Sequence, residues 1–166
     1  MKKLFTAITI IIAAIFIVSC AKEQVKEPEK VGVDTNIVSV SNEQLAKYPV
    51  TGFAYKSSTV PPQSWDKWAK VAAPVVKGIL DKLPDGYALE IRGHTDGRGP
   101  ESAEGAKPGN MKISTDRAKA VYDSLGKAGI TSPKLTYRGV GSSEALSGVD
   151  PKSAEQRRVT FQVVPK

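Results

Sequence analysis

The stretch that decides the fold of this 166-residue chain is EIRGHTDGRGP, residues 90–100. It continues an alternating pattern in which Tyr87, Leu89 and Ile91 are apolar, and such alternation is typical of a half-buried strand. The pattern then gives way to a glycine-rich loop that carries His94, the single histidine of the chain, and Asp96. The stretch therefore predicts a strand that ends at a functional loop. It leaves three kinds of site to distinguish: a catalytic pair, a metal site, or a site that binds a ligand without reacting.

The residues before this strand predict a strand and a helix. Residues 50–56 (VTGFAYK) favour a strand, whereas residues 63–83 carry apolar side chains at helical spacing. Pro74 lies inside that helix, where we expect a kink or a break. Trp65 and Trp68 lie on its apolar face, so we expect them in the core and not on a sugar-binding surface.

The residues after the strand complete the predicted architecture. A long loop covers residues 93–112, and Ser114 is the predicted N-cap of the helix that follows. Residues 134–140 predict a third strand, residues 141–156 a second loop and residues 157–164 a final strand. The order β-α-β-α-β-β predicts an α/β (α+β) sandwich, with two helices packed on one face of a mixed sheet.

The N-terminus predicts export. Two lysines precede an apolar run at residues 4–18, which is short for a bilayer-spanning helix and typical of a secretory signal. Residues 17–20 (IVSC) resemble a bacterial lipobox, in which cleavage precedes the cysteine and the cysteine is acylated. We expect a signal peptide at residues 1–19 and a lipid-modified Cys20. Because Cys20 is the sole cysteine, no intrachain disulfide can form.

Residues 20–47 are predicted to be a flexible tether. The stretch AKEQVKEPEKVGVDTN has mixed charge and no aromatic residue, and only residues 36–40 (NIVSV) favour a short strand. The folded domain is then expected at residues 48–166.

The net charge of +7 favours acidic partners. An exported lipoprotein does not meet the chromosome, so we expect no nucleic-acid partner.

Enzymatic and metal-binding interpretations have little support in the sequence. His94 and Asp96 are close together, but no nucleophile-elbow sequence accompanies them. A zinc site needs several imidazole or thiolate ligands, and this chain offers one histidine and one cysteine. The carboxylates near Asp96 do not follow a calcium-loop spacing. We therefore expect no catalytic residue, no metal and no cofactor.

A ligand-binding site agrees better with the charges. Asp96 follows the end of a strand, and Arg117 is predicted in the first turn of the next helix, so both would reach the same rim of the sandwich. A carboxylate and a guanidinium that face one cleft match a ligand with an ammonium and a carboxylate. The helix N-terminus also favours an anion. The spacing leaves an alternative equally open, in which Asp96 caps its own loop and Arg117 is a solvated surface charge.

Four ordered blocks resemble a known family. They are IRGHTDGRG (91–99), NMKISTDRAKAVYDSLGKAGI (110–130), YRGVGSSE (137–144) and QRRVTFQVV (156–164). Together they are similar to the OmpA-like, peptidoglycan-associated lipoprotein (Pal) domain over roughly residues 48–166. The resemblance implies an OmpA-C-like fold. It also implies non-covalent binding of the peptidoglycan stem peptide through its diamino acid, commonly diaminopimelate.

The resemblance also assigns roles to single residues. In that family the motif aspartate pairs the ligand's ammonium and the helix arginine its carboxylate, and these positions fall on Asp96 and Arg117. The motif asparagine falls on Asn110, and the first arginine of the final block on Arg157. Thr95 completes the expected binding set. The resemblance implies that His94 orients the loop through hydrogen bonds and does not react.

Three departures from the family pattern concern the site more than the fold. Residues 101–108 (ESAEGAKP) lengthen the loop between Asp96 and the helix. Gln156 stands where the family usually has asparagine, and Ala54 follows Phe53 where many members have aspartate. We expect these departures to affect affinity and ligand preference.

The resemblance implies a lipid-anchored cell-envelope protein that tethers the outer membrane to the wall, with its domain facing the periplasm. Ala21 after the cysteine is not the aspartate that retains lipoproteins in the inner membrane. The expected partners are peptidoglycan, the membrane through the lipid anchor, and other envelope proteins. The alternative is a surface-exposed lipoprotein that binds a host or envelope protein.

Overall fold

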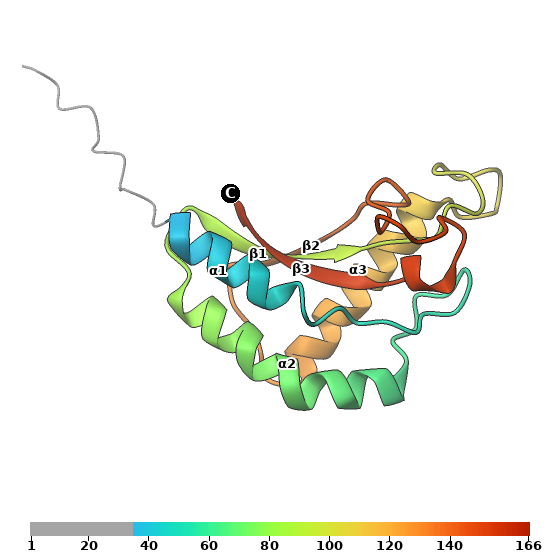
Figure 1. Cartoon of the computed structure of the whole chain (residues 1–166). Helices are drawn as coiled ribbons and strands as arrows, with labels where there is room; N and C mark the ends of the chain where they lie inside the picture. Colours follow the sequence, from blue (N-terminus) through green and yellow to red (C-terminus); the bar gives the residue numbers. More distant parts are fainter. Residues whose placement is uncertain (1–34) are drawn as a thin grey trace, which may run out of the picture. The chain divides into compact units, whose positions relative to one another are not determined.

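The computed structural model of the chain describes residues 35–166 (Figure 1). Its elements are, in order, α1 (Thr35–Leu45), α2 (Pro62–Lys82), β1 (Tyr87–Gly93), α3 (Asn110–Lys127), β2 (Leu135–Gly139), the short 3-10 helix η1 (Ala154–Gln156) and β3 (Val159–Pro165). The predicted signal peptide, the predicted acylation site at Cys20 and most of the predicted tether lie outside the described residues. Among the helices of residues 35–166, none has the length and apolar character needed to cross a bilayer.

The three strands form one mixed sheet in the order β2-β1-β3. β1 runs parallel to β2, with Leu89 opposite Leu135, and antiparallel to β3, with Leu89 opposite Val163. Because successive side chains of a strand alternate between the two faces, Leu89 and Ile91 lie on one face with their cross-strand neighbours. The predicted fold class, an α/β sandwich around a mixed sheet, is confirmed.

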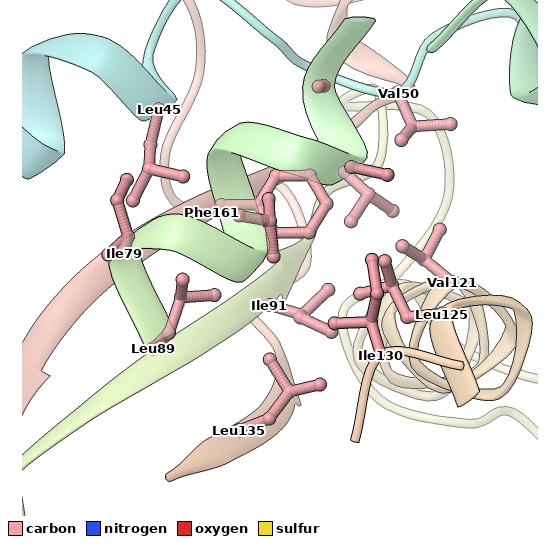
Figure 2. Close-up of a cluster of buried hydrophobic side chains, with 14 of the residues drawn as sticks. Leu45, Val50, Ile79, Leu89, Ile91, Val121, Leu125, Ile130, Leu135 and Phe161 are labelled. Carbon is pink, nitrogen blue, oxygen red and sulfur yellow. The ribbon is translucent and has the colours of Figure 1, made fainter. Parts of the chain in front are cut away.

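Helices α2 and α3 bury their apolar faces against this face of the sheet in a single cluster (Figure 2). Trp68 of α2 stacks on Phe161 of β3, with ring centroids 5.0 Å apart, and its indole N–H donates to the carbonyl of Tyr48 at 2.7 Å. Trp65 stacks on Trp68 and packs against the cluster. The prediction that the tryptophans belong to the core is confirmed for Trp68, whereas Trp65 is partly buried at the margin of the core.

Two glycines set the position of α3 on the sheet. A Cβ on Gly93, at the end of β1, would lie 1.9 Å from the carbonyl oxygen of Ser114, and one on Gly139, at the end of β2, would lie 2.4 Å from its Oγ. Only glycine allows this close approach. The prediction that Ser114 caps the helix is wrong: α3 begins at Asn110, and the Ser114 hydroxyl accepts a hydrogen bond from the N–H of Gly141 at 2.9 Å.

Helix α1 corrects two predictions about the N-terminal segment. Residues 36–40 are helical and not a strand, and Leu45 is only 1% exposed within the core cluster (Figure 2). The side-chain amide of Asn42 accepts from the N–H of Val163 at 2.7 Å and donates to its carbonyl at 3.3 Å. It therefore takes the place of a neighbouring strand on β3. The folded part thus starts before residue 48, because packing on the sheet overrides the local strand preference of NIVSV.

The prediction of a strand at residues 50–56 is wrong, and of the kink or break expected at Pro74 the structure excludes the break. The segment 50–56 pairs with the sheet only at Val50, which bridges Val159. Beyond it, Gly52 and Lys56 have positive φ angles of 88° and 56°, which turn the chain out of an extended path. Helix α2 runs through Pro74 without a break. Pro74 is exposed, so the carbonyl that loses its partner there can bond to water instead.

Candidate ligand-binding site

The structure brings the five predicted binding residues together around one hollow at the end of β1. Thr95, Asp96, Asn110, Arg117 and Arg157 all line it, together with Tyr55, Lys56 and Ile113. The hollow has a volume of only ≈ 10 Å³, close to the minimum that a single water needs. A larger ligand must therefore displace side chains at its rim.

The loop that follows β1 is held in place by its backbone. The N–H of His94 donates to the carbonyl of Arg158 at 2.9 Å, that of Thr95 to Gly141 at 2.8 Å, and that of Gly97 to Pro151 at 2.7 Å. These three bonds reach two segments distant in sequence. The Asp96 backbone is thus fixed before any ligand arrives.

Asp96 is buried and held by two arginines. Its Oδ2 accepts from Nη2 of Arg98 at 2.6 Å and from Nη1 of Arg157 at 2.9 Å, and its Oδ1 accepts from the backbone N–H of Arg98 at 3.2 Å. Burial alone would raise the pKa of Asp96, but the hydrogen bonds from Arg98 and Arg157 outweigh it and lower the pKa below the ordinary value. Asp96 is therefore a carboxylate at neutral pH.

Arg117 is 1% exposed and contacts backbone carbonyls. Its Nε donates to Ser57 at 2.8 Å, its Nη1 to His94 at 2.8 Å and its Nη2 to Ala54 at 2.9 Å. Each terminal nitrogen of a guanidinium carries a second N–H, and the described residues offer no acceptor for these two. Burial, together with the charge of Arg157, lowers the pKa of Arg117 to about 10, so it remains a cation. A buried cation with spare donors is suited to a carboxylate ligand.

The position of Arg117 in α3 differs from the prediction. Because α3 begins at Asn110, Arg117 lies about two turns into the helix and not in its first turn. It reaches the hollow from the side of the helix, whereas Asn110, the first residue of α3, also lines the hollow. The helix start and the guanidinium thus both face the same space.

The lining carries an excess of positive charge. Lys56, Arg117 and Arg157 are cations, and Asp96 is the single carboxylate among the lining residues. Arg157 is anchored, since its Nε donates to the carbonyl of Phe53 at 2.7 Å in addition to its bond with Asp96. The hollow therefore attracts an anionic group, and Asp96 remains the one place for a cationic group.

Thr95 and His94 have different surroundings. The hydroxyl of Thr95 is buried and has no hydrogen-bond partner among residues 35–166, although Thr95 lines the hollow. An unpaired buried hydroxyl costs free energy, so a ligand is the natural partner for it.

His94 is not one of the lining residues: it is 2% exposed, and its Nε2 lies 2.8 Å from Oγ1 of Thr160. Burial lowers the pKa of His94 to about 3, so the ring is neutral at physiological pH.

The lengthened loop is fastened at its base by Glu101. The carboxylate of Glu101 accepts from the backbone N–H of Ser142 at 3.2 Å, from the hydroxyl of Ser142, and from the side-chain amide of Asn110 at 3.3 Å. The same amide lies 3.4 Å from the carbonyl of Gly99. Asn110 therefore ties the loop to the helix while it lines the hollow.

Gln156, the second departure, is fully buried and also holds a loop. Its Oε1 accepts from the N–H of Leu146 at 2.8 Å, and its Nε2 donates to the carbonyls of Val149 and Asp150, both at 3.3 Å. It thus organises the segment before β3, and it is not one of the residues that line the hollow.

Sequence reasoning missed Arg98, Tyr55 and Lys56. Arg98 binds Asp96 and lies over the ring of Tyr55, with its guanidinium carbon 4.3 Å from the ring centroid. Its place two residues after Asp96 was an available signal. The backbone carbonyls that bind Arg117 could not be predicted from the sequence, because every residue type carries such a carbonyl. Among the described residues, no group of three or more metal-ligating side chains comes together.

Comparison with known proteins identifies related domains. The sequence model described as the OmpA family matches residues 52–159. No curated protein matches the chain by sequence. The peptidoglycan-associated lipoprotein from Burkholderia pseudomallei superposes with a TM-score of 0.55 at 23% identity, over 77% of this chain and 99% of that one. The OmpA-like domain of FopA1 from Francisella tularensis subsp. tularensis SCHU S4 gives 0.50 at 23% identity, over 69% and 70%. The C-terminal domain of Helicobacter pylori MotB gives 0.52 at 18%, over 71% and 84%.

Proposed function

Because the chain belongs to the OmpA family, we propose that its folded domain binds peptidoglycan non-covalently, without catalysing a reaction, and so links a membrane to the cell wall. One of the solved structures that it resembles is named a peptidoglycan-associated lipoprotein, which supports the proposal. The ligand is the diamino acid of the stem peptide, of the diaminopimelate type. Such a residue carries an ammonium and a carboxylate at one end of its side chain.

The observation that carries this proposal is the convergence of opposite charges on one hollow. Asp96 supplies the acceptor for the ammonium, and Arg117 has a spare N–H on each terminal nitrogen for the carboxylate. Arg157 lies beside both groups and strengthens the attraction for the carboxylate. The unpaired hydroxyl of Thr95 adds a further hydrogen-bonding group. The site thus offers a partner to each polar group of a diamino acid.

Binding without reaction is supported by the place of His94. A general base must reach the proton that it takes from a reacting group. His94 lies under the loop, bonded to Thr160, and its lowered pKa makes it a weak base. We therefore propose that this histidine supports the loop and that the site has no catalytic residue.

We propose further that the domain is held at a membrane by acylation of Cys20, with the acyl chains in the inner leaflet of the outer membrane. The sequence supports this proposal through the lipobox-like residues 17–20 and through Ala21. The segment between Cys20 and α1 would then be the tether. The domain would face the periplasm, where the wall lies.

A sedimentation assay with purified diaminopimelate-containing sacculi tests the proposal. We expect wild-type protein to sediment with the wall, and Asp96→Asn, which keeps the shape of the side chain but loses its charge, to remain largely in the supernatant. Losing one member of a buried charge pair costs about 2–5 kcal/mol of binding free energy. Asp123→Asn is the matched control, because Asp123 is 45% exposed and pairs with Lys119 on the outer side of α3. Equal sedimentation of the Asp96 and Asp123 variants would overturn the assignment.

A further inference from the structure

The carboxylate that the proposed function assigns to the ligand's ammonium is already bonded to two internal cations. Asp96 Oδ2 accepts both the 2.6 Å hydrogen bond from Arg98 and the 2.9 Å bond from Arg157. The hollow beside it has room for about one water. Both guanidinium groups bond to Oδ2, so an ammonium group can take a place on this oxygen when one of them moves away.

The two arginines differ in how firmly they are held. The side chain of Arg157 is 13% exposed, and its Nε is bonded to the carbonyl of Phe53. The side chain of Arg98 is 40% exposed, and beyond Asp96 it contacts the ring of Tyr55, a residue that is itself 45% exposed. On leaving Asp96, Arg98 would lose fewer contacts with the protein than Arg157 would. Arg98 is therefore the group that can leave.

We propose that Arg98 competes with the ligand for Asp96, and that its intramolecular ion pair sets the affinity of the site. In the closed form the guanidinium of Arg98 occupies the position of the ligand's ammonium. In the open form Arg98 turns into solvent, and the ligand's ammonium replaces it on Asp96. This proposal rests on the proposed function, since it concerns the same hollow and the same ligand class.

The competition has a defined thermodynamic form. Only the open fraction binds ligand, so the apparent dissociation constant exceeds the intrinsic one by the inverse of that fraction. A partly exposed pair stabilises the closed form by a small free energy, so its removal tightens binding about two- to fivefold. The factor is the same for every ligand that must displace Arg98, because the free energy of opening belongs to the protein alone.

The experiment measures affinity and association rate for two probes on the full chain. Diaminopimelate carries both ammonium and carboxylate groups, whereas pimelate has the same carbon chain and carboxylates without ammonium groups. For Arg98→Ala we expect diaminopimelate to bind about two- to fivefold more tightly, with faster association and unchanged dissociation in NMR line shapes. Pimelate has no ammonium group to place on Asp96, so its binding should not become tighter. Arg98→Lys, which keeps the charge, should lie nearer to the wild type.

Arg138→Ala is the matched control. Arg138 is an arginine paired with a carboxylate, that of Glu90, its side chain is 53% exposed, and it is not among the residues that line the hollow. Its removal lowers the net charge equally, so we expect no tighter binding. Weaker binding of diaminopimelate by Arg98→Ala would show that Arg98 grips the ligand, and it would overturn the proposal. Unchanged binding of diaminopimelate, or an equal gain in affinity for pimelate, would also overturn it.

Failure of the competition model can be told apart from failure of the proposed function. If wild-type protein sediments with sacculi and Arg98→Ala binds diaminopimelate no more tightly, the function stands and the competition is wrong. If neither the wild type nor Arg98→Ala binds sacculi or diaminopimelate, the function is wrong and the competition falls with it. Binding that appears only in Arg98→Ala supports both.

Discussion

In the part of the chain that the structure describes, Asp96 and Arg117 line the same hollow and yet do not form an ion pair with each other. Asp96 is bonded to Arg98 and Arg157, whereas Arg117 is bonded to the carbonyls of Ala54, Ser57 and His94. Because Asp96 and Arg117 have different hydrogen-bond partners and do not neutralise each other, both charges can interact with a ligand. This arrangement makes the site testable residue by residue.

Replacement of Arg117 should affect stability as well as binding. Arg117→Ala leaves three carbonyls without their donor, so we expect the free energy of unfolding to fall by about 3 kcal/mol. Urea denaturation followed by circular dichroism measures this change. Arg138→Ala, at an exposed position, should stay within about 0.5 kcal/mol of the wild type. Similar unfolding midpoints for the two variants would contradict the structural role of Arg117.

Replacement of Thr95 should separate stability from binding. Thr95→Val keeps the volume of the side chain and removes a buried hydroxyl that has no partner within residues 35–166. We expect the free protein to be unchanged or more stable by about 1 kcal/mol, because an unsatisfied group is removed.

The same variant should bind sacculi more weakly. Loss of one hydrogen bond to the ligand corresponds to an affinity reduced about five- to tenfold. Thr95→Ser, which keeps the hydroxyl, should retain most of the affinity in the sedimentation assay. A Val variant that is destabilised and binds as well as the wild type would assign Thr95 to the fold and not to the site.

The buried His94 should make stability depend on pH. The unfolded chain takes up a proton near the ordinary pKa of 6.5, whereas the folded chain does so only near pH 3. The stability that the neutral ring provides is therefore complete above pH 6.5 and falls with acidification, by up to about 1.4 kcal/mol per pH unit. The lowered pKa of Asp96 contributes only below its ordinary value of 3.8.

Urea unfolding measured between about pH 4.5 and 6.5 isolates the histidine. In His94→Gln, which cannot titrate, the slope of the unfolding free energy against pH should become shallower, whatever the variant's stability at neutral pH. Thr160→Val removes the neighbour of Nε2 but keeps the titrating ring, and it should retain the slope. An unchanged slope in His94→Gln would mean that other groups carry the acid dependence.

The start of the folded part can be tested by shortening the chain. A chain that starts at residue 48 loses Leu45 and the two hydrogen bonds of Asn42, which together contribute about 3–4 kcal/mol. We expect a clearly lower thermal midpoint than for a chain that starts at residue 33. Asn42→Ala in the full chain should lose about 1–2 kcal/mol, and Asn36→Ala, at an exposed position of the same helix, very little. Equal thermal midpoints for the two shortened chains would show that α1 belongs to the tether and not to the folded domain.

Much of the fold could be predicted because its signals are local. The alternation of Tyr87, Leu89 and Ile91 and the helical spacing around Trp68 each reflect which side faces the core. Where local preference and packing disagree, the prediction is wrong. NIVSV favours a strand by composition, but Asn42 and Leu45 gain hydrogen bonds and burial only as part of a helix on β3.

The site could be predicted only through its residue types. The predicted site is therefore incomplete, because it contains no backbone groups. Asp96 and Arg117 stand in recognisable motifs, and the structure brings both to one hollow. The carbonyls of Ala54 and Ser57 have no such signature, since any residue could supply them. The pairing of Arg98 with Asp96 depends on the path of a loop that sequence spacing alone does not determine.

The amide of Asn42 on Val163 also has a consequence for how copies of the protein coexist. A sheet border with free backbone groups is a template to which another polypeptide can add itself, and this addition is a common route to aggregation. Here Val50 pairs with the backbone of Val159, and the side chain of Asn42 bonds to the backbone of Val163. The stretch of β3 between these two positions is too short to pair with a strand of another molecule. Copies of the domain can therefore lie close together on a surface without pairing along the edge of β3.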